Sequence, residues 1–124
     1  MSNAVDDAIV RRDLLTSLVF VGVGWSVSTI AWSPDWVAIA AVVAAVSFLL
    51  GAAADRSDAG LWVLLGTGTV VAIALVLSTL TNSLPVATIG PSILGIAVGT
   101  GVNRLLFGVM NPVPGLRRRR EATD

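Results

Sequence analysis

The sequence predicts an all-α protein that crosses a membrane four times as a four-transmembrane-helix bundle. Hydrophobic residues make up 55% of its 124 residues and charged residues only 13%, whereas a soluble domain carries about 25% charged residues. The charges also gather at the ends of four long apolar runs and leave the runs themselves nearly uncharged. This pattern is typical of a chain whose solvent is lipid, where backbone groups must bond within each segment and helices are favoured.

Each apolar run is long enough to cross a bilayer as a helix. A helix rises about 1.5 Å per residue and the hydrocarbon core is about 30 Å thick, so about 20 residues suffice. We place the spans at residues 14–32, 36–54, 61–80 and 86–110. Val and Ile are abundant, but the runs lack the period-two alternation of membrane barrel strands.

Polar segments separate and flank these runs. A polar N-terminal segment covers residues 1–13, and an Arg-rich tail covers residues 111–124. The breaks between the spans are short, and short connections join antiparallel neighbours in helical bundles. We therefore expect neighbouring helices of the chain to pack side by side, with both termini on one side of the membrane.

Arginine placement predicts which side this is. Arginine occurs before the first run, in the second break and in the tail, but in neither the first nor the third break. Cytoplasmic loops of membrane proteins carry the excess of positive charge. We therefore expect a multi-pass protein of the cell membrane with both termini in the cytoplasm. The arginines expected to anchor this topology or to contact lipid headgroups are Arg11, Arg12, Arg117, Arg118, Arg119 and Arg120.

The fourth run contains the best candidates for close helix packing. Gly95 and Gly99 form a small-xxx-small pair, and Gly101 extends a second, mostly small face of the same helix. Small residues let two helix backbones approach closely in a membrane. We expect these glycines to pack inward or against another copy of the chain. Gly90 and Pro91 are expected to kink or open the external end of this helix, because Pro lacks the backbone N–H.

Three polar residues near the end of the fourth run are candidates for a pore or an interface: Thr100, Asn103 and Arg104. One interpretation makes Arg104 an anion contact at a cytoplasmic vestibule. The interpretation we favour is that its long side chain reaches the interface and pairs with an acid on the same side. The candidate acids are Asp13, Asp55 and Asp58.

Several functions are disfavoured by what the sequence lacks. It contains no Cys and no His, so thiolate and imidazole metal ligands and Cys or His catalysis are excluded. Phosphate-binding loops, paired carboxylates and nucleophile elbows do not occur. No acid lies in the middle of a span, as a proton-coupled carrier usually requires. We expect no enzyme activity, no catalytic residue, no metal and no cofactor, and the net charge of zero gives no reason to expect nucleic acid.

The sequence leaves open whether the chain contains a weak two-helix repeat. A Gly-x-Gly pair occurs in the first run (Gly22, Gly24) and again in the third (Gly66, Gly68). An even number of spans in each half would make such a repeat parallel, about an axis along the membrane normal.

The most economical role is a structural or accessory subunit that associates with itself or joins a membrane complex. Four short spans enclose little interior, so the Gly-rich faces are expected to need a partner. The alternative is a small oligomeric channel or transporter whose fourth helix lines the path.

Overall fold

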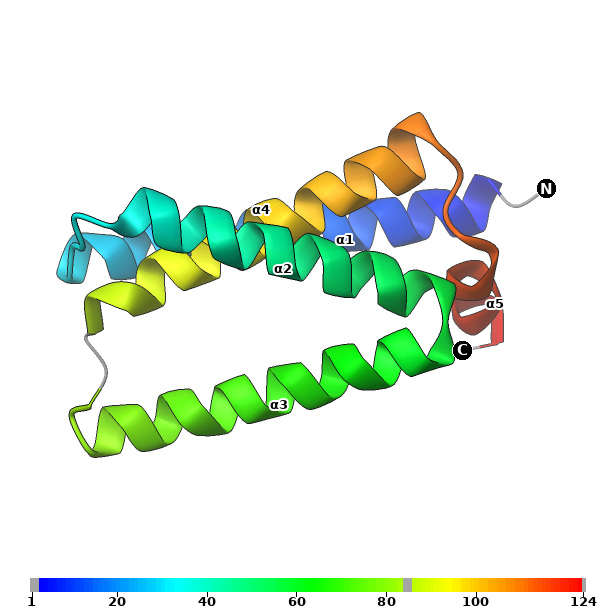
Figure 1. Cartoon of the computed structure of the whole chain (residues 1–124). Coiled ribbons are helices and arrows are strands. Elements are labelled where there is room, and N and C mark those ends of the chain that lie inside the picture. The colour runs from blue at the N-terminus through cyan, green and yellow to red at the C-terminus, as the bar shows by residue number, and fades with distance from the viewer. Residues whose placement is uncertain (1–2, 84–85, 124) are drawn as a thin grey trace.

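The computed structural model describes residues 3–83 and 86–123, and most of these residues are helical and none lies in a strand. The long helices are α1 (Asn3–Ile30), α2 (Trp36–Arg56), α3 (Asp58–Leu80) and α4 (Ile89–Arg104) (Figure 1). Short helices complete the chain: η1 (Val86–Thr88), η2 (Leu105–Met110) and α5 (Gly115–Thr123). Four segments are long and apolar enough to cross a membrane, because η1, α4 and η2 together form one of them. The predicted all-α class with four spanning helices is confirmed.

The ends of the chain are more ordered than the sequence suggests. The polar segment predicted at residues 1–13 is, from Asn3 onward, the first part of α1. The tail predicted at residues 111–124 contains α5, which packs against α1 and α2. Both ends of the chain lie at the same end of the molecule (Figure 1). Because both segments are helical, their charged side chains lie close together at this end of the molecule, where they can pair.

The connection between α2 and α3 is a single residue, Ser57. Its side-chain oxygen accepts a hydrogen bond of 2.9 Å from the backbone N–H of Gly60, which satisfies a free donor in the first turn of α3. A Cβ at Gly60 would collide with the carbonyl of Ala53. The tight turn therefore requires glycine at this position and a capping side chain beside it.

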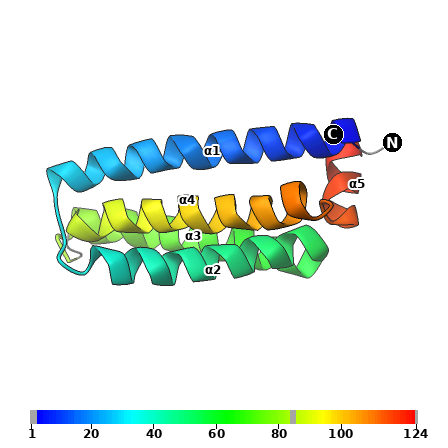
Figure 2. The same cartoon turned by 90° about the horizontal axis from the view of Figure 1, so that it is seen from above.

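Helix order in space differs from helix order in the chain. α4 lies between α1 and α2 and packs along both, as Figure 2 shows, while α3 makes its main contacts with α2. The expectation that neighbouring helices of the chain pack side by side holds for α2 and α3 and is wrong for α1 and α2 and for α3 and α4. Their short connection spans the end of the bundle, and the last long helix fills the space between them.

Small side chains allow α4 to approach α1 closely. A Cβ on Gly90 would collide with Ser28, and one on Gly101 would meet the Ser17 side chain at 3.5 Å. In between, Leu94 of α4 fits over Gly24 of α1. The partners run in opposite order along the two helices, so α1 and α4 are antiparallel. The mostly small face of α4 is therefore occupied by α1.

A second face of α4 packs against α2 in parallel orientation. A Cβ on Gly95 would lie 2.6 Å from the carbonyl oxygen of Ala40, and one on Gly99 would collide with the carbonyl of Ala44. Backbones this close gain van der Waals contact that larger residues would prevent. Both glycine faces of α4 are thus used within one chain, and neither remains for a second copy.

The two ends of the last span behave differently. Gly90 and Pro91 lie in the first turn of α4, where the N–H that Pro lacks would have no helical partner. The irregularity lies instead at the other end, where η2 is a π-helix and Phe107 has the non-helical angles φ −117° and ψ 58°. This break turns a backbone carbonyl toward Arg104.

α3 is the least covered of the long helices. Its partly covered residues are Leu61, Leu64, Thr67, Leu75 and Ser78, and most others are exposed. A Cβ at Gly66 or Gly68 would meet nothing within 4 Å. The pairing of α1 with α4 and of α3 with α2, around a central α2–α4 pair, is what a parallel repeat would give. The Gly-x-Gly pairs differ, however, because Gly24 is packed and Gly68 is open.

Candidate functional site

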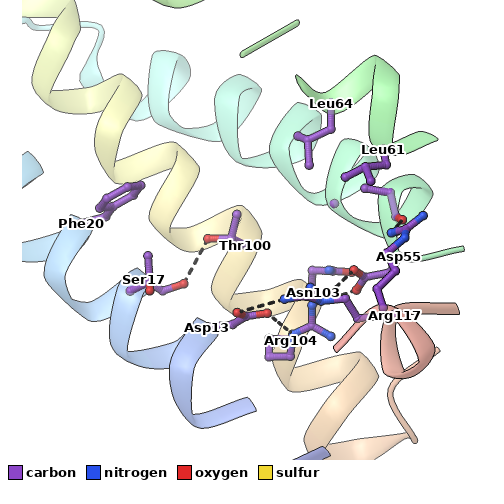
Figure 3. Close-up of a pocket in the computed structure, with 14 residues that line it drawn as sticks. Asp13, Ser17, Phe20, Asp55, Leu61, Leu64, Thr100, Asn103, Arg104 and Arg117 are labelled. Carbon is purple, nitrogen blue, oxygen red and sulfur yellow. Dashed lines mark hydrogen bonds and ion pairs between the residues drawn. The ribbon is translucent and has the colours of Figure 1, made fainter. Parts of the chain in front are cut away.

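A cavity of about 470 Å³ lies where α5 meets the long helices (Figure 3). Every α-helix of the chain contributes to its wall. The lining residues are Asp13, Thr16, Ser17 and Phe20 of α1, Gly51, Ala54 and Asp55 of α2, Leu61 and Leu64 of α3, Thr100, Asn103 and Arg104 of α4, and Arg117 and Arg120 of α5. The three polar candidates predicted in the fourth run therefore all face one cavity.

Arg104 is the centre of the charged part of the wall. Its Nε donates to Oδ2 of Asp13 at 2.9 Å, and its Nη2 donates to Oδ2 of Asp55 at 2.8 Å. Its Nη1 donates to the carbonyl oxygen of Phe107 at 3.2 Å, which the break in η2 makes available. The predicted pairing with Asp13 and Asp55 is confirmed. These partners bury the side chain, and Arg104 is only 4% exposed.

This geometry argues against Arg104 as an anion contact. All three guanidinium nitrogens already donate to protein oxygens, two of them on carboxylates. Taking a guanidinium out of water is costly unless such partners replace the water. Asp58, the third candidate partner of Arg104, pairs instead with Arg120 at 2.9 Å. The role of Arg104 is to tie three helices together at this end of the bundle.

The arginines of α5 are mostly occupied by the protein itself. Arg118 makes two hydrogen bonds to Asp6, of 2.6 and 2.9 Å, and Arg120 donates to the carbonyls of Ala54 and Ser57 at the end of α2. At the same end of the molecule Arg12 donates to Glu121 at 2.7 Å. Of the six arginines predicted as anchors, Arg11 and Arg119 have no ion pair among the described residues.

Arg117 differs from the other charged residues of the cavity. It lies 3.6 Å from Asp13, 3.7 Å from Asp55 and 3.5 Å from Glu121. These distances exceed those of charge-assisted hydrogen bonds, which are about 2.7–2.9 Å. Within the described part of the chain its guanidinium donates no hydrogen bond, although its side chain is only 21% exposed. Arg117 is therefore held by three longer ion pairs, and no direct hydrogen bond fixes it.

Asn103 is buried and incompletely bonded. It is 3% exposed, and its Oδ1 finds no hydrogen-bond donor among the described residues. Its Nδ2 stands over Gly51, where a Cβ would lie 3.3 Å away. A buried acceptor without a donor costs about 1–3 kcal/mol. The amide is therefore suited to accept a hydrogen bond from something that enters the cavity.

Ser17 and Thr100 form the polar wall between the charged end and the apolar end. Their hydroxyl oxygens lie 3.0 Å apart, and Thr100 donates to the carbonyl of Ile96 at 2.7 Å. Ser17 is therefore the donor in the pair. Sequence reasoning missed Ser17 and Phe20 as site residues. Their positions four and seven residues after Asp13 place all three on one helical face, which is the signal that could have identified them.

No group of three or more His, Cys, Asp or Glu that could hold a metal ion occurs in residues 3–83 and 86–123. The two cavity carboxylates both face Arg104. The cavity wall thus combines guanidinium groups with carboxylates, an amide and hydroxyls.

The fold places this chain in the class of all-helical proteins with four helices long and apolar enough to cross a membrane. Comparison with protein-family models, curated proteins and solved structures finds no match.

Proposed function

We propose that this chain is a multi-pass protein of the cell membrane with both termini in the cytoplasm. Four apolar helices of spanning length support the membrane location. Arg12 and Arg118 join α1 to α5, Arg120 joins α5 to the end of α2, and Arg104 lines the cavity beside α5. This gathering of arginines supports a cytoplasmic location for the end of the bundle that carries α5. At the other end Trp32 and Trp36 contact each other in a tilted arrangement, with ring centroids 5.5 Å apart, in keeping with the aromatic belt at a membrane interface.

Labelling tests this orientation, and the absence of Cys makes the chain convenient for it. A cysteine placed at Asp35, an exposed position in the connection between α1 and α2, should react with a membrane-impermeant maleimide in intact cells. A cysteine placed at Arg119 should react only after the cells are opened. The reverse pattern, or equal reactivity at both positions, would contradict the proposed topology.

Within the membrane, the chain is best explained as a structural or accessory subunit that self-associates or joins a larger complex. The observation that carries this proposal is the position of α3. Both glycine faces of α4 are covered by α1 and α2, whereas Gly66 and Gly68 of α3 face open space. Exposed apolar side chains are normal in lipid, but exposed helical glycines provide a surface for close approach by another helix.

Photo-crosslinking tests this role. A photoreactive amino acid at Gly68 of α3 should form a discrete crosslinked product in native membranes, either a dimer or a complex with another subunit. The matched control carries the same residue at Val42, an exposed position on α2, where no glycine faces open space. Crosslinks of equal yield from both positions, or none from position 68, would contradict an association surface on α3.

A second candidate function is a small channel or transporter, and the cavity beside Thr100 and Asn103 favours it. Because α4 is central in the chain, such a path would run through one protomer along α4 and not along an oligomer axis. Purified protein in liposomes should then conduct a tested solute, and Thr100→Trp should abolish the flux. Absence of flux together with a crosslinked partner would favour the accessory role.

A further inference from the structure

The cavity beside α5 is polar on one side and apolar on another. Phe20 of α1 and Leu61 and Leu64 of α3 line it together with Thr100 and Asn103 of α4 (Figure 3). Phe20 is 38% exposed, and α1 and α3 are not among the helix pairs that pack closely in the described chain. The apolar side of the cavity therefore lies next to a surface that faces hydrocarbon in the proposed membrane location.

The charged residues of the wall are already paired with one another. The pairs are Arg104 with Asp13 and Asp55, Arg117 with Asp13, Asp55 and Glu121, Arg120 with Asp58, and Arg12 with Glu121. Positive and negative charges balance across this set. A charged ligand would have to break one of the pairs, and a buried charge left without its partner is costly. The cavity therefore favours a ligand without charge.

The amide of Asn103 is the polar group of the wall that lacks partners. Asn103 is 3% exposed, and neither its Oδ1 nor its Nδ2 has a hydrogen-bond partner among the described residues. The Nδ2 lies beside Gly51, another lining residue, where a Cβ would come within 3.3 Å of it. Rotation about the last side-chain bond exchanges the donor and the acceptor of an amide. A hydroxyl both donates and accepts, so it can pair with either end.

The neighbouring wall offers a second point of contact for a hydroxyl. Ser17 uses its hydrogen in the bond to Thr100, which itself donates to the carbonyl of Ile96, so the oxygen of Ser17 remains an acceptor. The volume of about 470 Å³ is far larger than the share of one water molecule, about 30 Å³. It lies within the range of pockets that bury small organic ligands, about 300–1,000 Å³.

We propose that the cavity binds the uncharged, hydroxyl-bearing head of an acylglycerol lipid. Its hydroxyl pairs with the amide of Asn103, and its hydrocarbon begins against Phe20 and Leu64. Free glycerol has the same hydroxyl chemistry, but only a lipid also covers the apolar side chains of the wall. This inference rests on the proposed membrane location and is independent of the accessory role.

Lipid retention by the full chain in detergent tests the site. The protein is equilibrated with mixed micelles that contain equal amounts of dioleoylglycerol, dioleoylpropanediol, dioleoylphosphatidylcholine and dioleoylphosphatidylglycerol. It is then repurified, and the retained lipids are measured by mass spectrometry. We expect at least tenfold more dioleoylglycerol than any other lipid, because dioleoylpropanediol has hydrogen in place of the hydroxyl and the two phospholipids carry charges. Free glycerol at millimolar concentration should not displace it, since glycerol has no chain.

Two variants with matched controls locate the binding. Asn103→Leu leaves no polar atom unpartnered, so the fold should persist, while retention of dioleoylglycerol should fall tenfold or more. Asn111→Leu changes the same residue type at an exposed position outside the cavity and should leave retention unchanged. Leu64→Trp fills the apolar part of the cavity and should also weaken retention tenfold, whereas Val63→Trp on the exposed side of α3 should not.

Preferential retention of either phospholipid overturns the uncharged ligand, and equal retention of dioleoylglycerol and dioleoylpropanediol overturns the hydroxyl contact. Equal retention by the Asn103→Leu and Asn111→Leu variants overturns the assignment to this cavity. Displacement by millimolar glycerol overturns the lipid assignment and indicates a free polyol. If no lipid is retained, the cavity holds only water and the proposal is wrong; a topology confirmed by labelling would then still establish the membrane location.

Discussion

Arg104 of α4 and Asp55 of α2 form a buried ion pair, with 2.8 Å between Nη2 and Oδ2. Arg104 is 4% exposed and Asp55 6% exposed. The pair lies at the end of a seam that is otherwise made of glycines and small side chains. Apolar packing brings α2 and α4 together along the seam, and the ion pair fixes how far one helix can slide along the other.

Asp55→Asn should destabilise the protein strongly. Removing one partner of a buried ion pair leaves the other charge uncompensated and typically costs about 3–5 kcal/mol. The free energy of unfolding in mixed micelles should fall by about this amount, with some relief from Asp13, which also pairs with Arg104. The control Asp7→Asn removes an exposed acid at the same end of the molecule and should change stability by less than about 0.5 kcal/mol. Equal effects of the two variants would show that the pair contributes no specific stability.

Gly95→Ala should weaken the packing of α4 on α2. The new Cβ would lie 2.6 Å from the Ala40 carbonyl oxygen and 2.7 Å from Cβ of Val43, so one helix must move. Overpacking of this kind costs about 1–3 kcal/mol. The unfolding free energy measured in mixed micelles checks this.

Gly66→Ala is the matched control for that variant. Its Cβ would enter open space on α3, so the better helix propensity of Ala should leave stability unchanged or raise it by up to about 1 kcal/mol. If Gly95→Ala proved as harmless as Gly66→Ala, the close approach of α2 and α4 would be wrong.

The docking of α5 should depend on salt. Its contacts with the long helices include the bonds from Arg118 to Asp6 and from Arg12 to Glu121, and Arg12 is well exposed. The screening length falls from about 10 Å at 0.1 M salt to about 3 Å at 1 M. Trypsin should therefore cleave after the tail arginines faster in high salt, with activity normalised on a peptide substrate. Asp6→Asn should raise the cleavage rate at low salt, and Asp7→Asn should not.

The Ser17–Thr100 hydrogen bond should contribute little to stability. Hydrogen bonds between membrane helices average about 0.6 kcal/mol in double-mutant cycles. Thr100 also bonds to its own helix at Ile96, so loss of Ser17 leaves it partnered. A cycle of Ser17→Ala and Thr100→Val should give a coupling energy below about 1.7 kcal/mol. A larger value would indicate that the pair holds α1 and α4 together by itself.

Hydropathy was enough to predict the number of helices long and apolar enough to span a membrane, and their even number placed the two ends of the chain at one end of the bundle. These features are local, because a run of apolar residues favours a spanning helix whatever its neighbours are. The pairing of Arg104 with Asp13 and Asp55 was also predictable, since a buried guanidinium needs acids and few lay at its level. The small face of α4 could also be predicted, because the spacing of its glycines is a local pattern in the sequence.

The tertiary structure alone decided which helix covers that face. The same glycines could have packed on another copy, and the choice of α1 and α2 as partners depends on the shapes of three helices together. The tertiary structure places α4 in the centre and leaves α3 beside α2 with its glycines open. It also folds the Arg-rich tail back onto the acids of α1 and α2. The ion pairs of Arg117, and the Oδ1 of Asn103 that finds no donor among the described residues, follow from that arrangement. Contacts between residues far apart in the chain are set by the free energy of the whole bundle, which no local pattern encodes.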